Sequence, residues 1–348
     1  MTSRERVLAS FAHEEGDRVP IWCGLSDEFR RKACKQLSLD EEGLLQRLGD
    51  DFRRVHARYS GPPVKLQCPD AKMRTPFGVE RAGLGYGQPI SHPLHDATLA
   101  QVHEYPWPDP NWVDVSHLRA EAQVWGRRYA ILGGDWSPFW HDAIEMLGME
   151  TFYFKMHDEP ELIDALLGHI VEYYFQSSRR IFDAAADVID IFFMGNDYGS
   201  QTGPLMSPDM FKRFLLPHQK RLIDLGHDYG LKTQMHCCGG VEPLIPLFID
   251  AGLDALHAVQ TTCHGMDLAH LKSHYGGRIV FNGGIDSHHV LIDGTTDCVR
   301  AKTREVLAIM MPGGGYVAGA THDSVLEETP VENIVAMCDT IRDDGVYA

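Results

Sequence analysis

Residues 231–259 read LKTQMHCCGGVEPLIPLFIDAGLDALHAV, and this stretch decides the fold class. A short strand-like run ends on His236 and is followed by a pair of glycines, a helical segment and a second run, 253–259. Two short buried runs joined by a helix form the pattern of a βαβ unit, whose strands are parallel. The stretch therefore predicts an α/β protein built on a parallel sheet.

The same alternation continues on both sides of this stretch. Further runs that end in Gly, Asp, Asn or His precede helical segments, and we expect strands within 128–134, 187–195, 278–281 and 315–320, with 17–24 as one more candidate. Polar residues gather at the C-terminal ends of these runs, where a (β/α)8 barrel builds its active site. No GxGxxG follows a first strand, so we predict a (β/α)8 TIM barrel rather than a doubly wound sheet.

Residues 40–127 follow the alternation less well. They contain Pro62-Pro63, FGVERAGLGYGQP at 77–89 and PWPDPNW at 106–112. Clusters of Gly and Pro mark turns and loops. We interpret 40–127 as irregular additions at the barrel mouth, an N-terminal elaboration within a single domain that spans 1–348.

Charge and composition exclude several classes of protein. The 348 residues carry a net charge of −17, which disfavours nucleic acid and anionic membranes as partners. No apolar run approaches the roughly 18 residues of a membrane span, and the charged N-terminus has no signal-peptide core. We expect a cytoplasmic protein, in which the eight cysteines are metal ligands or buried thiols rather than disulfides. The sequence leaves the oligomeric state open.

The HxC motif at 236–238 is the strongest candidate for a metal site. Alternate residues of a strand share a face, so His236 and Cys238 point the same way while Cys237 points away. An imidazole and a thiolate together suit Zn²⁺. Buried packing and a strained disulfide between the two adjacent cysteines are the alternative interpretations.

Further metal ligands must come from other strand ends. His322 follows the last predicted strand in GATHD and is the best third candidate. Asp197, Asp135 and Glu242 are weaker candidates for a fourth ligand. A catalytic zinc site would keep an open position for water or substrate.

Other strand ends supply candidates for catalysis and substrate binding. Asp197 in GNDYGSQ and Asp135 in GGDWSPFW could orient a substrate or move a proton, or else serve as turn caps. We also expect substrate contacts from Trp136, His257, Gln260, Asn282 and Asp286. Core packing, and a helix-capping role for Asp286, are the alternatives.

Five segments, in order, carry a resemblance to a known family: TSRERVLASFAHEEGDRVP (2–20), GNDYGSQTGPLMSPDMF (195–211), HCCGG (236–240), FNGGID (281–286) and PGGGYVAGATHDSVLEETPVENI (312–334). Together they resemble the uroporphyrinogen decarboxylase superfamily, which includes cobamide-dependent methyltransferases. The resemblance implies a (β/α)8 barrel, in agreement with the alternation of strands and helices.

Within that superfamily, the zinc-dependent methyltransferases carry an HxC motif after a late strand and a further cysteine near the last strand. His236 and Cys238 match the HxC motif, whereas the last-strand cysteine is absent and His322 lies nearby. The decarboxylases also place a histidine there, so His322 does not discriminate between the two branches. Their arginine-rich loop after the first strand is missing, although Arg30 and Arg31 are present in that region. The resemblance is therefore closer to the methyltransferase branch.

The resemblance implies a zinc-dependent methyltransferase that moves a methyl group between a corrinoid and a small thiol, because zinc lowers the pKa of a bound thiol. The chain has no DxHxxG corrinoid signature, so a separate corrinoid protein would be the partner. Three alternatives remain open: decarboxylation of a tetrapyrrole carboxylate, pterin-directed methyl transfer without zinc, and a noncatalytic metal- or ligand-binding barrel.

Overall fold

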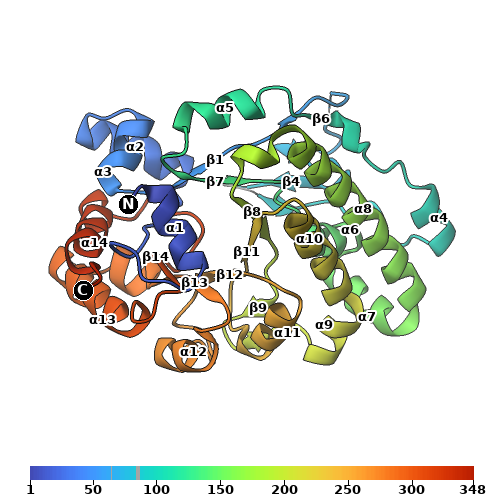
Figure 1. The fold of residues 1–348 in the computed structure, drawn as a ribbon. Coiled ribbons are helices and arrows are strands. Elements are labelled where there is room, and N and C mark those ends of the chain that lie inside the picture. The colour runs from blue at the N-terminus through green and yellow to red at the C-terminus, as the bar shows by residue number, and fades with distance from the viewer. Residues whose placement is uncertain (64, 84–86) are drawn as a thin grey trace.

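The computed structural model describes residues 1–63, 65–83 and 87–348. Its centre is a parallel sheet of seven strands in the order β1-β7-β8-β11-β12-β13-β14. The sheet curls, and helices cover its outer side (Figure 1). The strands are β1 (Phe52–Arg54), β7 (Ala130–Gly133), β8 (Ile191–Gly195), β11 (Lys232–His236), β12 (Ala255–Val259), β13 (Val280–Ile285) and β14 (Tyr316–Ala320).

The helices mostly alternate with these strands, as the sequence predicts. They are α1 (Ser3–Phe11), α2 (Asp27–Leu37), α3 (Glu41–Leu48), α4 (Leu99–Glu104), α5 (Leu118–Trp125), α6 (Phe139–Leu147), α7 (Met149–Asp158), α8 (Pro160–Ala185), α9 (Pro208–Phe214), α10 (Leu216–Asp228), α11 (Ile245–Asp250), α12 (Leu268–Tyr275), α13 (Thr296–Met310) and α14 (Val331–Asp344). Short 3₁₀ turns occur at η1 (Pro110–Trp112), η2 (Ala186–Val188) and η3 (Glu242–Leu244), and a π-helix at η4 (Ser287–Ile292). In the described part of the chain, no helix has the length and apolar character that a membrane crossing requires.

The segment 20–22 lies between the two edge strands of the sheet. Trp22 N donates to Ala318 O of β14 at 2.9 Å, and Asp51 N, next to β1, donates to Ile21 O at 3.0 Å. Ile21 forms a parallel bridge with Ala318. The candidate strand within 17–24 is thus a bridging segment, and the extended ladder has seven strands.

Side chains alternate between the two faces of the sheet, as the period of a strand requires. In β8, Ile191 and Phe193 belong to an inner cluster, whereas Phe192 and Met194 belong to the outer core. The inner cluster also includes Phe11 of α1, so this helix packs against the interior of the sheet.

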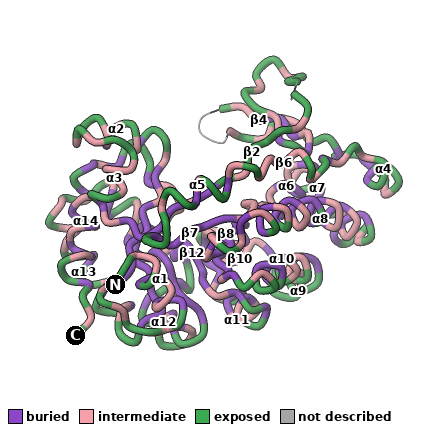
Figure 2. Tube along the Cα trace, turned by 45° about the horizontal axis from the view of Figure 1, so that its top comes forward, coloured by how far each residue is buried: buried purple, intermediate pink, exposed green. Residues whose placement is uncertain are grey.

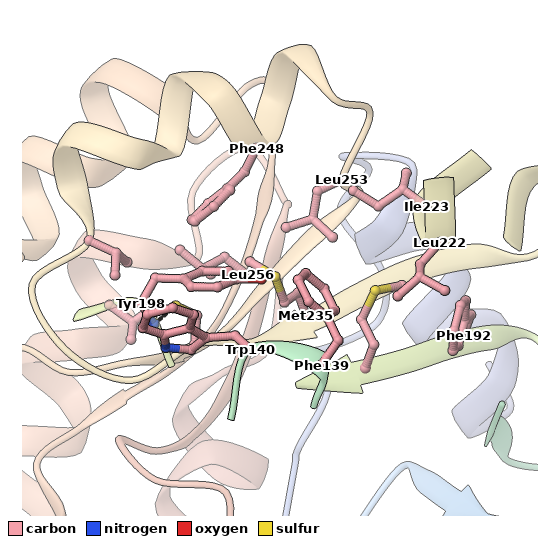
Figure 3. Close-up of a cluster of buried hydrophobic side chains, with 14 of the residues drawn as sticks. Phe139, Trp140, Phe192, Tyr198, Leu222, Ile223, Met235, Phe248, Leu253 and Leu256 are labelled. Atoms are coloured by element: carbon pink, nitrogen blue, oxygen red, sulfur yellow. Dashed lines mark hydrogen bonds between the residues drawn. The ribbon is translucent and has the colours of Figure 1, made fainter. Parts of the chain in front are cut away.

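The outer core fills the space between the sheet and its helices. Figure 3 shows Phe192, Met235 and Leu256 of three strands beside Leu222 of α10 and Phe248 of α11. All five side chains are fully buried. Fully burying one such side chain contributes roughly 1.5–3 kcal/mol, so this layer holds the strand ends in fixed positions.

Residues 40–127 are not additions throughout, which corrects the interpretation above. β1 pairs in parallel with β7 through Phe52 and Ala130 and is therefore part of the main sheet. Only beyond β1 does the chain form two small antiparallel sheets, and Figure 2 shows the segment around β4 extending from the body. These contain β2 (Arg58–Tyr59) with β6 (Val113–Asp114), and β3 (Met73–Arg74) with β4 (Glu80–Ala82) and β5 (Gln88–Pro89); a third small sheet elsewhere pairs β9 (Gly199–Ser200) with β10 (Gly203–Pro204).

Candidate functional site

Three potential metal ligands meet at the C-terminal ends of β8 and β11. Cys238 Sγ lies 3.2 Å from His236 Nε2, so the HxC residues do share one face. Asp197, which follows β8, places its Oδ1 at 3.3 Å from the same nitrogen. One donor atom of each residue lies within 4.8 Å of those of the other two. We call these three residues the donor cluster.

Glycines allow the two loops that carry the donor cluster to pack closely. Gly239 has a φ of +96°, a conformation that side chains with a Cβ rarely adopt. A Cβ on Gly239 would also lie 2.3 Å from the backbone of Gly199 in the loop after β8. Cys238 N donates to Asp197 Oδ1 at 2.7 Å across the same contact. The glycines therefore bring the carboxylate to the HxC motif.

The Asp197 carboxylate is held in its charged form. Asp197 N donates to His141 Nε2 at 3.0 Å, and the same imidazole lies 3.5 Å from Asp197 Oδ2. Burial raises the pKa of Asp197, but the bonds from His141 and His236 lower it further, so that the pKa lies well below its usual value. His141 was not among the predicted site residues, because in the sequence it lies within helix α6 and not directly after a strand.

The donor cluster attracts positive charge. Burial lowers the pKa of His236, but Cys238 and Asp197 outweigh burial and hold this pKa well above its usual value. Burial raises the pKa of Cys238, and His236 opposes that effect. A metal cation bound at this point would displace the protons on His236 and Cys238, because thiol and imidazole groups bind a metal in their deprotonated forms.

His257 stands behind His236, not at the surface. The two residues occupy paired register positions on β11 and β12, and their Nδ1 atoms are 3.2 Å apart. His257 is fully buried, and its Nδ1 lies 4.0 Å from Asp323 Oδ1. Burial holds the pKa of His257 well below its usual value, which favours the neutral ring. A direct substrate contact was predicted for His257, and in the structure its ring lies against that of His236.

His322 lies beside the donor cluster rather than within it. Its ring centroid is 6.3 Å from that of His236, and its Nδ1 accepts from Ser324 N at 3.2 Å. Two strands, β12 and β13, separate β14 from β11, whereas β8 is a direct neighbour of β11. Asp197 therefore lies with the HxC residues, and His322 stays a predicted ligand beside them, while the next residue, Asp323, approaches His257.

Gln260 and Trp136 contact the donor cluster directly. Gln260 Nε2 donates to Cys238 Sγ at 3.4 Å, and its Oε1 accepts from Gly239 N at 2.8 Å. The Trp136 ring packs 5.6 Å from the His236 ring, and the guanidinium of Arg54 lies 5.1 Å from the Trp136 ring centroid. Both were predicted as substrate contacts, and in the structure both lie against the donor cluster.

The other three predicted residues lie farther from the donor cluster. Asp135 accepts from Ser177 Oγ at 2.8 Å and lines a separate cavity of about 340 Å³; burial raises the pKa of Asp135. Asn282 is fully buried and donates to Gln234 Oε1 at 3.3 Å. Asp286 Oδ1 accepts from the backbone at 288 and 289, so the capping interpretation describes this residue.

Comparison with known proteins places the chain in a family. The sequence model of uroporphyrinogen decarboxylase (URO-D) matches residues 114–343. A methylcobamide:CoM methyltransferase of Methanosarcina mazei is 20% identical over 201 residues, 57% of this chain and 56% of that protein. A uroporphyrinogen decarboxylase of Parasynechococcus marenigrum is 28% identical over 214 residues, 60% of this chain and 56% of that protein. The chain thus spans little more than half the length of these relatives.

A solved structure shares the fold. A methyltransferase from Methanosarcina mazei superposes with a TM-score of 0.66 at 19% identity, covering 99% of both chains. The match to the family model extends over more than half of the chain and confirms the resemblance seen in the sequence motifs. This protein therefore belongs to the uroporphyrinogen decarboxylase family.

Proposed function

We propose that this protein is a zinc-dependent methyltransferase that moves a methyl group between a corrinoid, carried by a separate protein, and a small thiol. One observation carries the proposal: His236 Nε2, Cys238 Sγ and Asp197 Oδ1 converge at two adjacent strand ends. Similarity to a methylcobamide:CoM methyltransferase supports the corrinoid and the thiol. The site would open at the mouth of a complete (β/α)8 barrel, with residues 20–22 as its eighth strand.

The donor cluster fits zinc in its chemistry. One nitrogen, one sulfur and one oxygen donor are ordinary zinc ligands, and three protein ligands leave a fourth position for substrate. His236, Cys238 and Asp197 would hold the ion in place of the set predicted from sequence, in which His322 was third. A bound zinc ion would act as a Lewis acid that lowers the pKa of an incoming thiol.

Neighbouring residues would fix these ligands. His257 Nδ1 is placed to accept the proton on His236 Nδ1, which leaves His236 Nε2 free to face the ion. Gln260 donates to the Cys238 sulfur and limits the negative charge that collects on it. His141 keeps the Asp197 carboxylate charged and oriented. Each of these contacts would set the direction of one ligand.

Decarboxylation of a tetrapyrrole carboxylate is the second candidate, and one observation favours it. Arg30 and Arg54 line a cavity of about 430 Å³ that also contains Asp323. Arg30, however, lies within 3.3 Å of Asp27 and 3.7 Å of Glu41, so acidic side chains already compensate part of its charge. Arg53 also lines this cavity and pairs with Glu42 at 2.9 Å, so two of the three arginines in the cavity already face carboxylates of the protein.

An assay with methylcobalamin and 2-mercaptoethanol tests the proposal. We expect zinc-loaded protein to form the S-methyl product, detected by mass spectrometry, with loss of the methylcobalamin absorbance. Stripping the protein with a chelator should abolish transfer, and added zinc should restore it. Release of CO₂ from uroporphyrinogen without transfer to any thiol would instead establish the decarboxylase.

A further inference from the structure

Two cavities lie near the donor cluster, and they differ in size and in the charged side chains that line them. The small cavity has a volume of about 200 Å³ and is reached from the cluster through Gln260 and His322, which line it. The arginine cavity has a volume of about 430 Å³ and lies on the side of Trp22 and Asp323. Ser324, in the loop after β14, lines both cavities.

The small cavity is unsuited to an anion. Among the described residues that line it, Asp286 is the one Asp, Glu, Lys or Arg. Its other polar lining consists of hydroxyl, amide, thiol and imidazole groups. The arginine cavity, in contrast, is lined by Arg30, Arg53 and Arg54 together with four acidic residues, Glu41, Asp50, Glu121 and Asp323. An anionic group placed in the small cavity would face a carboxylate without a guanidinium or ammonium to balance it.

The backbone amides near Asp286 are not available to an anion either. His288 N and His289 N donate to Asp286 Oδ1 at 2.8 and 3.2 Å. Ser287 N donates to Thr321 Oγ1 at 3.0 Å. Three successive amides, which could otherwise bind a sulfonate or carboxylate, are therefore already occupied within the protein.

The volume of the small cavity limits what it holds. Sites for drug-sized ligands usually measure about 300–1,000 Å³, so a cavity of about 200 Å³ accommodates only a short chain. A corrinoid is far larger than this volume. The cavity can therefore hold a small acceptor, while the methyl donor must approach from outside it.

We propose that the small cavity binds the tail of the acceptor thiol, and that this tail is neutral or cationic, such as a hydroxyl or an amine, rather than a sulfonate or carboxylate. The inference rests on the proposed function. In the reaction, the thiol loses its proton to solvent and its sulfur forms a bond to the methyl carbon. The carbon–cobalt bond of the methylcorrinoid breaks, and both electrons stay on cobalt.

Three thiols of one length, HS–CH₂–CH₂–X, test this proposal with zinc-loaded protein and methylcobalamin. We expect kcat/KM for cysteamine and 2-mercaptoethanol to exceed that for 2-mercaptoethanesulfonate by about tenfold or more, because like charges a few ångströms apart repel strongly in a partly buried site. Direct calorimetric titration should rank the thiols in the same way, with a lower Kd for cysteamine and 2-mercaptoethanol than for 2-mercaptoethanesulfonate.

Asp286→Asn isolates the carboxylate, since the Asn side-chain oxygen can still cap the turn at 287–292. In this variant we expect the ratio of kcat/KM for cysteamine to kcat/KM for 2-mercaptoethanol to fall by roughly threefold to tenfold. Arg31→Gln is the matched control, because Arg31 is exposed, pairs with Glu28 and lines neither cavity. The kcat/KM values of Arg31→Gln protein should rank the three thiols in the same order as those of the unaltered protein.

The outcomes separate the inference from the proposed function. Preferential transfer to 2-mercaptoethanesulfonate, lost in Arg54→Gln, would place the acceptor in the arginine cavity and overturn the inference while methyl transfer stands. Equal kcat/KM for all three thiols would also overturn it. Absence of transfer to every thiol by zinc-loaded protein would overturn the proposed function itself.

Discussion

The two halves of the parallel sheet present different side chains to the interior. β7 and β8 contribute an apolar set: Ala130, Leu132, Ile191 and Phe193. β11 to β13 contribute a buried polar set: Gln234, His236, His257 and Asn282. In the polar half, His236, His257 and Asn282 occupy register positions that pair across neighbouring strands.

This difference shows which part of the sheet lowers the free energy of unfolding. Among the described residues, the buried atoms without a hydrogen-bond partner include Gln234 Nε2, His257 Nε2 and Asn282 Oδ1. Each such atom costs roughly 1–3 kcal/mol relative to a satisfied one. An apolar side chain would pack there at lower cost, as Ile191 and Phe193 do on the other side. The polar half is thus best explained by a functional requirement.

The adjacent cysteines give the largest expected effect. Cys238 belongs to the donor cluster, whereas Cys237 is buried in the outer core and accepts from Tyr198 N at 3.3 Å. We expect Cys238→Ser to weaken zinc binding by at least about 100-fold, because a soft thiolate ligand is lost. Competition with a chromophoric chelator measures this change.

Cys237→Ser is the matched control one residue away. It should bind zinc within a factor of about three of the unaltered protein and lower the melting temperature, because a hydroxyl replaces a buried thiol. If both variants lost zinc equally, the assignment of the two cysteines to opposite faces would be wrong.

His257 gives an intermediate effect. Replacing it with Leu removes the acceptor opposite His236 Nδ1, and loss of such a partner typically weakens metal binding by about 10–100-fold. His257→Asn keeps an acceptor oxygen close to the position of Nδ1, so it should retain more of the affinity. The visible spectrum of the cobalt-substituted protein should shift for Leu more than for Asn. Identical affinities for the two variants would contradict a positioning role.

Ile191 in the apolar half gives the smallest effect. Ile191→Val deletes one buried methylene and should lower the free energy of unfolding by about 0.5–1.5 kcal/mol. Zinc affinity should not change, because Ile191 belongs to the inner apolar cluster and not to the donor cluster. Urea unfolding and the same chelator competition measure both quantities. A change in zinc affinity would show that the two halves are not independent.

Most of the sheet could be predicted from sequence, and one strand could not. The six strands from β7 onward follow the alternation of short strand-like runs, turn signals and helical segments. β1 has three residues, two of which are arginines, so it offers no apolar run to detect. It forms because Phe52 and Ala130 pair across two neighbouring strands, which is information that local sequence does not contain.

The candidate site was predictable only where spacing decides geometry. A separation of two residues in a strand places His236 and Cys238 on one face, and the structure agrees. The third donor depends on how the loop after β8 turns, which sequence does not specify. Asp197 was therefore expected mainly to position substrate and only as a weaker fourth ligand, with His322 as the third ligand, whereas Asp197 lies in the cluster and His322 lies beside it.

X-ray absorption spectroscopy at the zinc edge of the purified protein tests the central claim most directly. The donor cluster predicts about one zinc per chain, with one sulfur neighbour at about 2.3 Å and nitrogen or oxygen neighbours at about 2.0–2.2 Å. The sulfur neighbour should disappear in Cys238→Ser protein loaded with excess zinc. Protein that binds no zinc, or a zinc ion with no sulfur neighbour, would contradict the metal site and the methyl transfer that depends on it.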